Sequence, residues 1–507
     1  MASTTIRPKN VRRNILKPTA AAFLLAYLST TFPKIGSVLI SHLRKHGDLA
    51  RALNQVRNAL ASGLALNRFP AFCTVVVGGS TALRDPINHV FQTLDTRIHG
   101  RESLVRTRNN RVAARFVAAV LSAIVGFRLL NSPSNPKFVR PTRRISDVLI
   151  DGDEPRSKRP SKIPSGLPPL PAQAVSSKPS AAALGAPLAG KTMDLTLFAV
   201  ARAADVLAQW YWQTKKTKGR LARWWDGKSS PILFALSSAL IMNAFFYAPA
   251  RLPYTYVQWI GRIAECDERL IHALRQARYG NFVYGKDTGM APLLGSMAKE
   301  YNLPEEYGDP AKTIPVPCEL VHHGCGPSCE KHALWRFWRS WKLALGVYAP
   351  LQALVVLRRL QSQKVRRLDV LRKASVDTAR SSAFLGAFVA LFYYGVCLTR
   401  TRLVPKLFSR KTITPQMYDS GLCVLGGCLL CGWSVLLELA HRQAELMLFV
   451  LPRALGVWFP RRYLREHRWR EEIAFAISTA IVLTAAQERP DRIRGVFGRL
   501  LKQVMPA

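Results

Sequence analysis

Three uninterrupted apolar runs constrain this chain more than any other feature. The runs are Pro231–Ala250, Ser381–Thr399 and Ser420–Leu437, and none of them contains a charged residue. A helix of about 20 apolar residues crosses the hydrocarbon core of a bilayer, because it pairs its backbone polar groups internally. The runs therefore predict transmembrane helices. The 49% hydrophobic content excludes a disordered chain, and nine cysteines in 507 residues are too few for a disulfide scaffold.

Seven further apolar segments are shorter, or are interrupted by charges or proline. They are Thr19–Phe32, Leu60–Leu83, Val112–Phe127, Asp194–Trp212, Trp341–Leu357, Ala444–Phe459 and Ile473–Gln487. Of the ten candidates in all, we expect about six to ten to span a membrane. The alternative is a soluble all-helical protein with buried helices, which the basic clusters next to the charge-free runs disfavour.

The chain is strongly basic, with 73 Lys and Arg against 31 Asp and Glu and a formal net charge of +42. The basic residues gather between apolar runs, at Arg7–Lys17, Arg101–Arg115, Lys215–Arg223, Arg400–Lys411 and Arg461–Arg470. A nucleic-acid-binding domain would instead concentrate them on one face. The layout is typical of membrane flanks, where each Lys or Arg gains about 1 kcal/mol from anionic headgroups. The expected partner is therefore an anionic lipid bilayer, with no nucleic acid.

Two gap-free alignments relate the halves of the chain. The first places Asp194–Phe198 on Glu445–Phe449 and Arg202 on Arg453, and the second places Phe234–Ala239 on Phe475–Ala480 and Pro249 on Pro490. The order is kept, which indicates a tandem duplication. Repeated membrane blocks are common in transporters and channels. We therefore predict an all-α polytopic integral membrane protein built from two related blocks of transmembrane helices.

Composition divides the chain further. Residues 132–191 contain eleven prolines with many Ser, Lys and Arg residues, and are expected to form a disordered insertion. The predicted parts are a first membrane block at 1–131 (segments 1–3), the disordered loop at 132–191, segments 4–5 of that block at 192–279, a polar connector at 280–317, a Cys-rich motif with the first helix of the second block at 318–360, and the rest of the second block at 361–507.

Arg202 and Arg453 are charged residues at equivalent places inside apolar segments. A charge within a membrane is costly and is by default a functional candidate. The alternative is an arginine near a helix end that extends its head group to the interface. Both interpretations remain open at this stage.

Cysteine and histidine are dense between residues 318 and 329. Cys318, His323, Cys325 and Cys329 are the candidate metal ligands, because thiolate and imidazole are the donors that zinc prefers. The spacing is not that of a standard zinc finger. A disulfide and a packed turn next to the membrane are the alternatives, and no cofactor is expected.

No P-loop, GxSxG elbow, HExxH motif or dinucleotide-binding fingerprint occurs in the sequence. We therefore expect no catalytic residues and no enzymatic activity. A membrane-embedded lipid-modifying enzyme is kept as an alternative, and it requires a pocket that gathers His and acidic residues from several helices.

The segment with Cys318, His323 and Pro327–Cys329, followed by Tyr348–Leu351, resembles the cysteine-rich domain of the transmembrane protein 135 family. Ser381–Arg400 and Ala474–Arg492 are similar to later apolar segments of that family. The resemblance covers about residues 318–507, with the cysteine-rich domain at about 318–360. In animal members that domain opens the chain, so the long basic part before Cys318 is consistent with a fungal-type member.

The resemblance implies a multi-pass protein of peroxisomal or mitochondrial membranes that takes part in membrane dynamics and lipid homeostasis, with other organelle membrane proteins as partners. The family carries no established catalytic residues, so the resemblance transfers none to this chain. Its distant similarity to channel-forming subunits of the mitochondrial inner-membrane translocases implies a transporter or translocation channel as the alternative function. The leading hypothesis is a non-catalytic helical bundle that scaffolds or conducts lipid or protein cargo.

Overall fold

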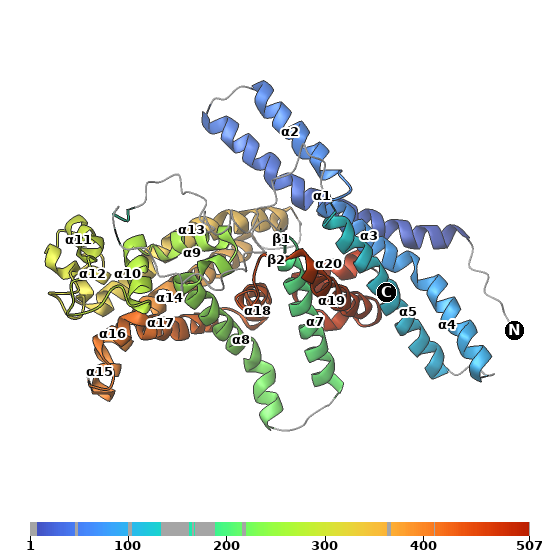
Figure 1. Ribbon diagram of the computed structural model, residues 1–507. Helices are drawn as coiled ribbons and strands as arrows, with labels where there is room; N and C mark the ends of the chain where they lie inside the picture. The colour runs from blue at the N-terminus through green and yellow to red at the C-terminus, as the bar shows by residue number, and fades with distance from the viewer. Residues whose placement is uncertain are drawn as a thin grey trace. The chain divides into compact units, whose positions relative to one another are not determined.

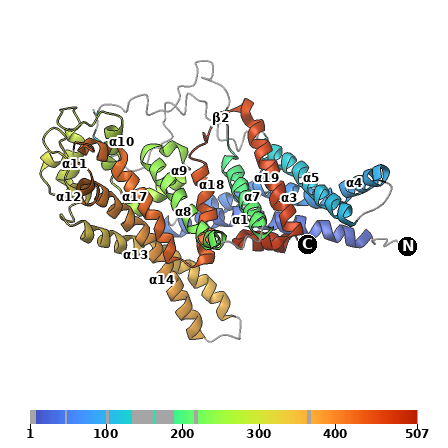
Figure 2. The same ribbon diagram turned by 90° about the horizontal axis from the view of Figure 1, so that it is seen from below.

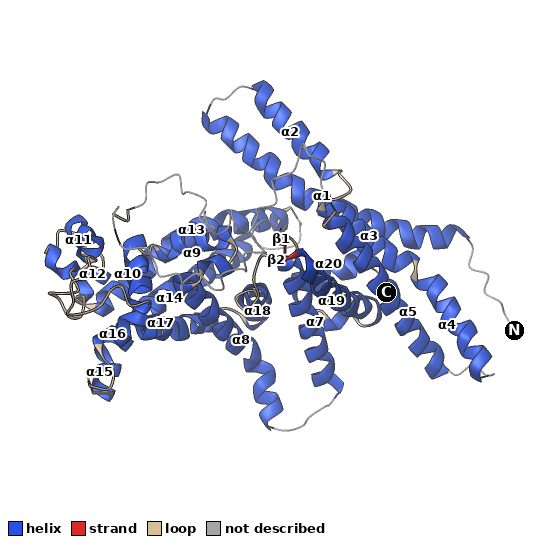
Figure 3. Cartoon of the chain, viewed as in Figure 1, coloured by secondary structure: helices blue, strands red, loops and turns tan. Residues whose placement is uncertain are grey.

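Helices make up about 81% of the chain that the structure, a computed structural model, describes (Figure 3). The described residues are 8–45, 49–99, 104–132, 162–164, 167, 188–214, 220–361, 367–409 and 411–505. Within them, strand is limited to β1 (Leu188–Ala189) and β2 (Tyr463–Leu464), which pair antiparallel with Leu188 opposite Leu464. The all-α prediction is confirmed. The predicted disordered loop at 132–191 lies almost entirely outside the described residues.

The chain divides into two compact units. Unit 1 comprises 1–143, 187–218 and 462–507, and unit 2 comprises 144–186 and 219–461. The helices of unit 1 are α1 (Pro8–Lys45), α2 (Leu49–Gly63), α3 (Phe69–Ala82), α4 (Arg84–His99), α5 (Leu104–Leu130), α7 (Met193–Thr214), α19 (Arg468–Glu488) and α20 (Gly495–Val504) (Figure 1).

Unit 2 holds the remaining α-helices, several of them short. They are α8 (Arg220–Tyr247), α9 (Tyr254–Ala264), α10 (Glu268–Arg278), α11 (Ala291–Glu300), α12 (Cys318–Val321), α13 (Cys329–Leu360), α14 (Arg367–Cys397), α15 (Val404–Leu407), α16 (Pro415–Met417), α17 (Cys423–Cys431) and α18 (Ala440–Leu455). The units differ from the predicted blocks: α8 and α9 belong to unit 2, and α19 and α20 belong to unit 1.

Six helical segments in the described ranges are long and apolar enough to cross a membrane. They are Ile15–His42, Leu104–Leu130, Lys228–Tyr247, Cys329–Leu360, Arg367–Leu407 and Pro415–Leu437. The seven less regular apolar segments of the sequence also fall wholly or largely within helices. The exposed residues of the spanning segments include many Leu, Val and Trp side chains, as expected where lipid replaces water. The chain is thus an all-α membrane protein by the length and composition of its helices.

Small residues bring the helices of unit 1 close together. α1 packs on α3, α3 on α5, α5 on α19, and α19 on α7. A Cβ added at Gly79 of α3 would lie 2.6 Å from the hydroxyl oxygen of Ser122 on α5. The rings of Phe72 and Phe127 each lie within 5.8 Å of the ring of Phe475, which fixes α19 against both helices. This small-residue packing is the usual means of association between membrane helices, since lipid supplies no hydrophobic drive.

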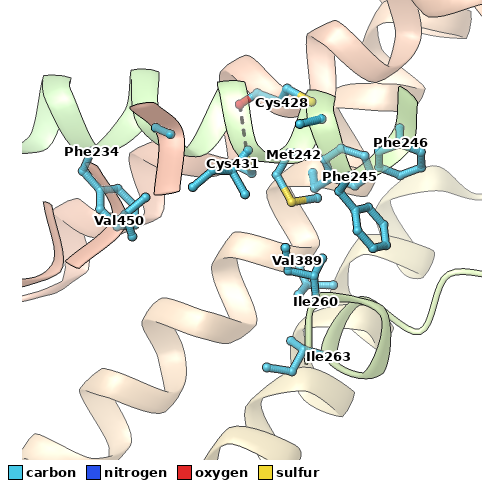
Figure 4. Packing of buried hydrophobic residues seen from close by; sticks show 14 of the residues in the cluster. Phe234, Met242, Phe245, Phe246, Ile260, Ile263, Val389, Cys428, Cys431 and Val450 are labelled. Carbon is cyan, nitrogen blue, oxygen red and sulfur yellow. Dashed lines mark hydrogen bonds between the residues drawn. The ribbon is translucent and has the colours of Figure 1, made fainter. Parts of the chain in front are cut away.

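Unit 2 is packed in a similar way. α13 packs on α14, α14 on α17, α17 on α8, and α8 on α18; the long pair of α13 and α14 runs side by side in Figure 2. A Cβ at Gly427 would lie 2.7 Å from the carbonyl oxygen of Phe392, and one at Gly432 would lie 2.5 Å from the Cα of Ala235. Figure 4 shows the apolar core between these helices, with Met242, Val389 and Cys428 among its buried side chains.

The predicted polar connector is folded. It forms the greater part of a cap, defined here as residues 268–321 with α10, α11 and α12, which lies at one end of unit 2 (Figures 1 and 2). Met290, Leu293, Met297 and Leu320 are fully buried in its core. α11 has ten residues and α10 has eleven, so neither is long enough to cross a bilayer.

Candidate functional site

A tight turn brings the cysteines of the 318–329 segment together. α12 ends at Val321, and the next residues adopt positive φ at His323 (56°), Gly324 (73°) and Gly326 (91°), a region that glycine enters without strain. The chain then reverses into α13, whose first turn is capped by the Ser328 hydroxyl, which accepts a hydrogen bond from the Lys331 amide. The reversal places the start of α12 beside the start of α13.

Three potential metal donors meet at this reversal. One atom each from Cys318, His322 and Cys329 lies within 4.8 Å of the other two. A fourth donor next to this group comes from the last residue of α14: the Sγ of Cys397 lies 3.4 Å from Nε2 of His322, and its thiol shares a hydrogen bond with the thiol of Cys329. His322 is fully buried, and Cys329 and Cys397 are each 3% exposed. Three thiols and one imidazole therefore lie close together, in a place that is buried except at Cys318, which is partly exposed.

The imidazole of His322 is oriented for ligation. Its Nδ1 lies 2.8 Å from the carbonyl oxygen of Gly326, so Nδ1 carries the proton and donates it there. This assignment leaves the lone pair on Nε2, which faces Cys397. Burial lowers the pKa of His322, and the positive charge of Arg336 lowers it further. The ring is thus neutral near pH 7, the state in which imidazole binds metals.

The structure separates the four ligands suggested by the sequence. Cys318 and Cys329 lie in the cluster. His323 points elsewhere: its ring stacks on Tyr301 with centroids 5.1 Å apart, and its Nδ1 accepts a hydrogen bond from Arg336 at 3.0 Å. Burial lowers the pKa of His323 to about 3. Cys325 belongs to no group of metal donors among the described residues.

Two buried arginines hold α13 and α14 to neighbouring parts of unit 2. Arg336 is 1% exposed, donates to the carbonyl oxygen of Ala264, and lies 4.3 Å above the ring of Tyr393. Arg400, counted above among the basic flanks, is instead buried and forms an ion pair with Asp419 at 2.8 Å. The hydroxyl of Tyr284 also bonds to Asp419. No sequence signal pointed to these contacts, because the partners are far apart in the chain.

Arg202 and Arg453 each lie over two aromatic rings. The guanidinium of Arg202 is 5.2 Å from the ring centroids of both Phe198 and Phe497. That of Arg453 is 3.9 Å from Phe449 and 5.2 Å from Tyr256. One ring comes from the arginine's own helix, and the other from the short amphipathic helix α20 or α9 of the same unit. This placement favours a packing role for both charges.

A cavity of about 50 Å³ lies between the cap and helices α8, α14 and α17. Its walls are almost wholly apolar, although Arg400 and Asp419 reach its surface and no histidine lines it. Sites for small molecules usually have about 300–1,000 Å³. A second cavity of about 440 Å³ lies between α13 and α14, and its lining residues are apolar apart from Gln352, Ser375 and Thr378. Comparison with models of protein families, with curated proteins and with solved structures finds no match to this chain.

Proposed function

We propose that this protein is a multi-pass membrane protein of peroxisomes or mitochondria that works without catalysis. Its helical bundles would scaffold or conduct lipid or protein cargo, as the resemblance to the transmembrane protein 135 family implies. The observation that carries the proposal is the presence of two bundles with one packing order. Duplicated bundles are a recurrent way to build membrane proteins that move or organise material.

The packing order supports a duplication with exchanged helices. In unit 1 the order is α1, α3, α5, α19, α7, and in unit 2 it is α13, α14, α17, α8, α18. Each copy would contribute its first four helices to one unit and its fifth helix to the other. The sequence alignments agree with this correspondence, because they pair α7 with α18 and α8 with α19.

Two details of local structure support the same duplication. α8 ends at Tyr247, a 3₁₀ turn follows at Pro249–Arg251, and α9 begins at Tyr254. With identical spacing, α19 ends at Glu488, a 3₁₀ turn follows at Pro490–Arg492, and α20 begins at Gly495. We use the name aromatic clamp for each of Arg202 and Arg453 with its two rings. The alignments also superimpose the two aromatic clamps: Arg202 on Arg453, Phe198 on Phe449 and Phe497 on Tyr256.

Membrane integration is tested by washing vesicles with alkaline carbonate. We expect the chain to stay in the pellet, because six spanning helices hold it in the hydrocarbon core. Release into the supernatant would overturn the proposal. Imaging of a tagged copy against peroxisomal and mitochondrial markers tests the location. Organelle lipid composition, compared with and without the gene, tests the role in lipid homeostasis.

The duplicated bundles also favour a second candidate function, a transporter or translocation channel. Under that function Arg202 and Arg453 would handle cargo, and R202Q/R453Q would abolish cargo movement at an unchanged protein level. Under a packing role, any loss of function would follow the loss of folded protein. The measurement is the lipid composition of cells that carry the double variant, normalised to the level of the protein. A change that remains after normalisation supports cargo handling, and a change that disappears supports packing.

The Arg453 clamp gives a stability prediction. We expect R453Q and Y256A each to lower the melting temperature in detergent, because each removes a cation–π contact worth about 0.5–2 kcal/mol. The double variant should lose less than the sum of the two single losses, because the Arg453–Tyr256 contact is counted in both. K331Q, at an exposed position of α13, is the control and should melt like the wild type. Fully additive losses would show that the contact contributes nothing.

A further inference from the structure

We propose that the donors gathered at the start of α13 bind one structural zinc ion. The ligands are Cys318, His322, Cys329 and Cys397. This inference goes beyond the proposed function, because it assigns a metal to a protein for which the sequence favoured no cofactor. It also replaces two of the four candidates from the sequence, His323 and Cys325, with residues that the fold brings together.

The donor set fits zinc in number and chemistry. Structural zinc sites are closed, four-coordinate and built from Cys and His, with Zn–S near 2.3 Å and Zn–N near 2.0–2.1 Å. Neighbouring ligand atoms of such a tetrahedron lie about 3.5–3.8 Å apart. Nε2 of His322 and Sγ of Cys397 are 3.4 Å apart, and the donors of Cys318, His322 and Cys329 are within 4.8 Å. Cys397 lies outside that group of three mutually close donors, so its side chain must shift toward them to complete the tetrahedron.

The surroundings of the site also suit a metal. The bond from His322 Nδ1 to the Gly326 carbonyl is the outer-shell contact that fixes a ligating histidine in its tautomer and orientation. Three thiolates with one zinc ion leave a charge of −1.

The ion would join three parts of unit 2. Cys318 and His322 come from α12 and the residue after it, Cys329 from the first residue of α13, and Cys397 from the last residue of α14. Cys397 is separated from Cys329 by the whole of both long helices. One zinc ion would therefore fasten the cap to the ends of two spanning helices, in the way that a cross-link does.

Metal content of the purified full-length chain in detergent, without chelators, tests the proposal. We expect about one zinc ion per wild-type chain by mass spectrometry of the metal, and less than one-tenth of that for C397S and C329S. C325S is the matched control, because Cys325 lies in the same turn outside the cluster, and it should keep its zinc. Wild type without zinc, or C325S that loses zinc as fully as C397S, would overturn the assignment.

A measurement on the wild type alone keeps the test independent of variant folding. Cobalt exchanged into the site should give the intense thiolate-to-metal absorption and the visible bands of a tetrahedral complex. Peptide mass spectrometry after alkylation should show Cys318, Cys329 and Cys397 blocked before chelation and alkylated after it. A mass two hydrogens lower in a peptide pair joining two of these cysteines would identify a disulfide instead. A disulfide between two of these cysteines, or alkylation of all three before chelation, would exclude the zinc site.

Discussion

D419A is expected to destabilise unit 2 by about 3–5 kcal/mol, because it leaves a buried arginine without its counterion. Arg400 is 6% exposed, and its guanidinium reaches Asp419 at 2.8 Å through both Nε and Nη2. The same carboxylate accepts a bond from the Tyr284 hydroxyl of the cap. Removing the Asp419 carboxylate therefore leaves the buried Arg400 without its counterion and the Tyr284 hydroxyl without its acceptor. Thermal unfolding in detergent, followed by tryptophan fluorescence, measures the loss.

The matched control for this experiment is D491A. Asp491 pairs with Lys502 at 3.7 Å, but both side chains are mostly exposed, and such surface pairs contribute about 0–1 kcal/mol. A double variant, R400M/D419L, replaces the buried charges by apolar groups of similar size and should recover much of the stability. If D419A melts within the error of D491A, the Arg400–Asp419 pair is not a buried support of the fold.

G427L is expected to prevent normal packing of α14 against α17. A Cβ at Gly427 would already lie 2.7 Å from the Phe392 carbonyl oxygen, and one at Gly395 would lie 2.8 Å from the Cα of Gly427. The contact is backbone to backbone, so no side chain can move aside. Overpacking costs about 1–3 kcal/mol even for a few methylenes, and here a whole side chain must be accommodated. We expect little monodisperse protein after size-exclusion chromatography.

G346L separates this steric effect from the general effect of leucine in a helix. Gly346 lies in α13, and a Cβ added there would meet no atom within 4 Å. Glycine is about 0.8–1.0 kcal/mol less favourable than alanine in a helix interior, and leucine ranks just below alanine, so G346L should be neutral or slightly stabilising. Equal yields of monodisperse G427L and G346L would contradict the close approach of α14 and α17.

What the sequence could predict was decided by local patterns. Ten apolar segments predicted helices correctly, because hydropathy over about 20 residues needs no knowledge of distant neighbours. The cap was underestimated as a polar connector, although Met290, Leu293, Leu294 and Met297 recur at the spacing of one apolar helix face. That pattern is short, and the polar residues around it lowered the mean hydropathy of the segment.

The candidate site was only half accessible from the sequence. Cys318 and Cys329 were found because they lie close together in the chain. Cys397 is a cysteine inside an apolar run, where most cysteines serve only to pack, and only the fold places it near His322. The choice between His322 and His323 depends on a turn with three positive φ angles, which sequence spacing does not specify.

The assignment of α19 and α20 to unit 1 has a consequence for synthesis of the protein. All of unit 2 lies before residue 462, so it can close while the ribosome is still translating. The first helices of unit 1 are synthesised before unit 2, but its α19 is synthesised after unit 2. Phe72 and Phe127 can therefore pack on Phe475 only when the ribosome has translated more than 300 further residues. A stop codon between residues 462 and 475 would therefore remove α19 from the amino-terminal bundle and leave every residue of unit 2 in place.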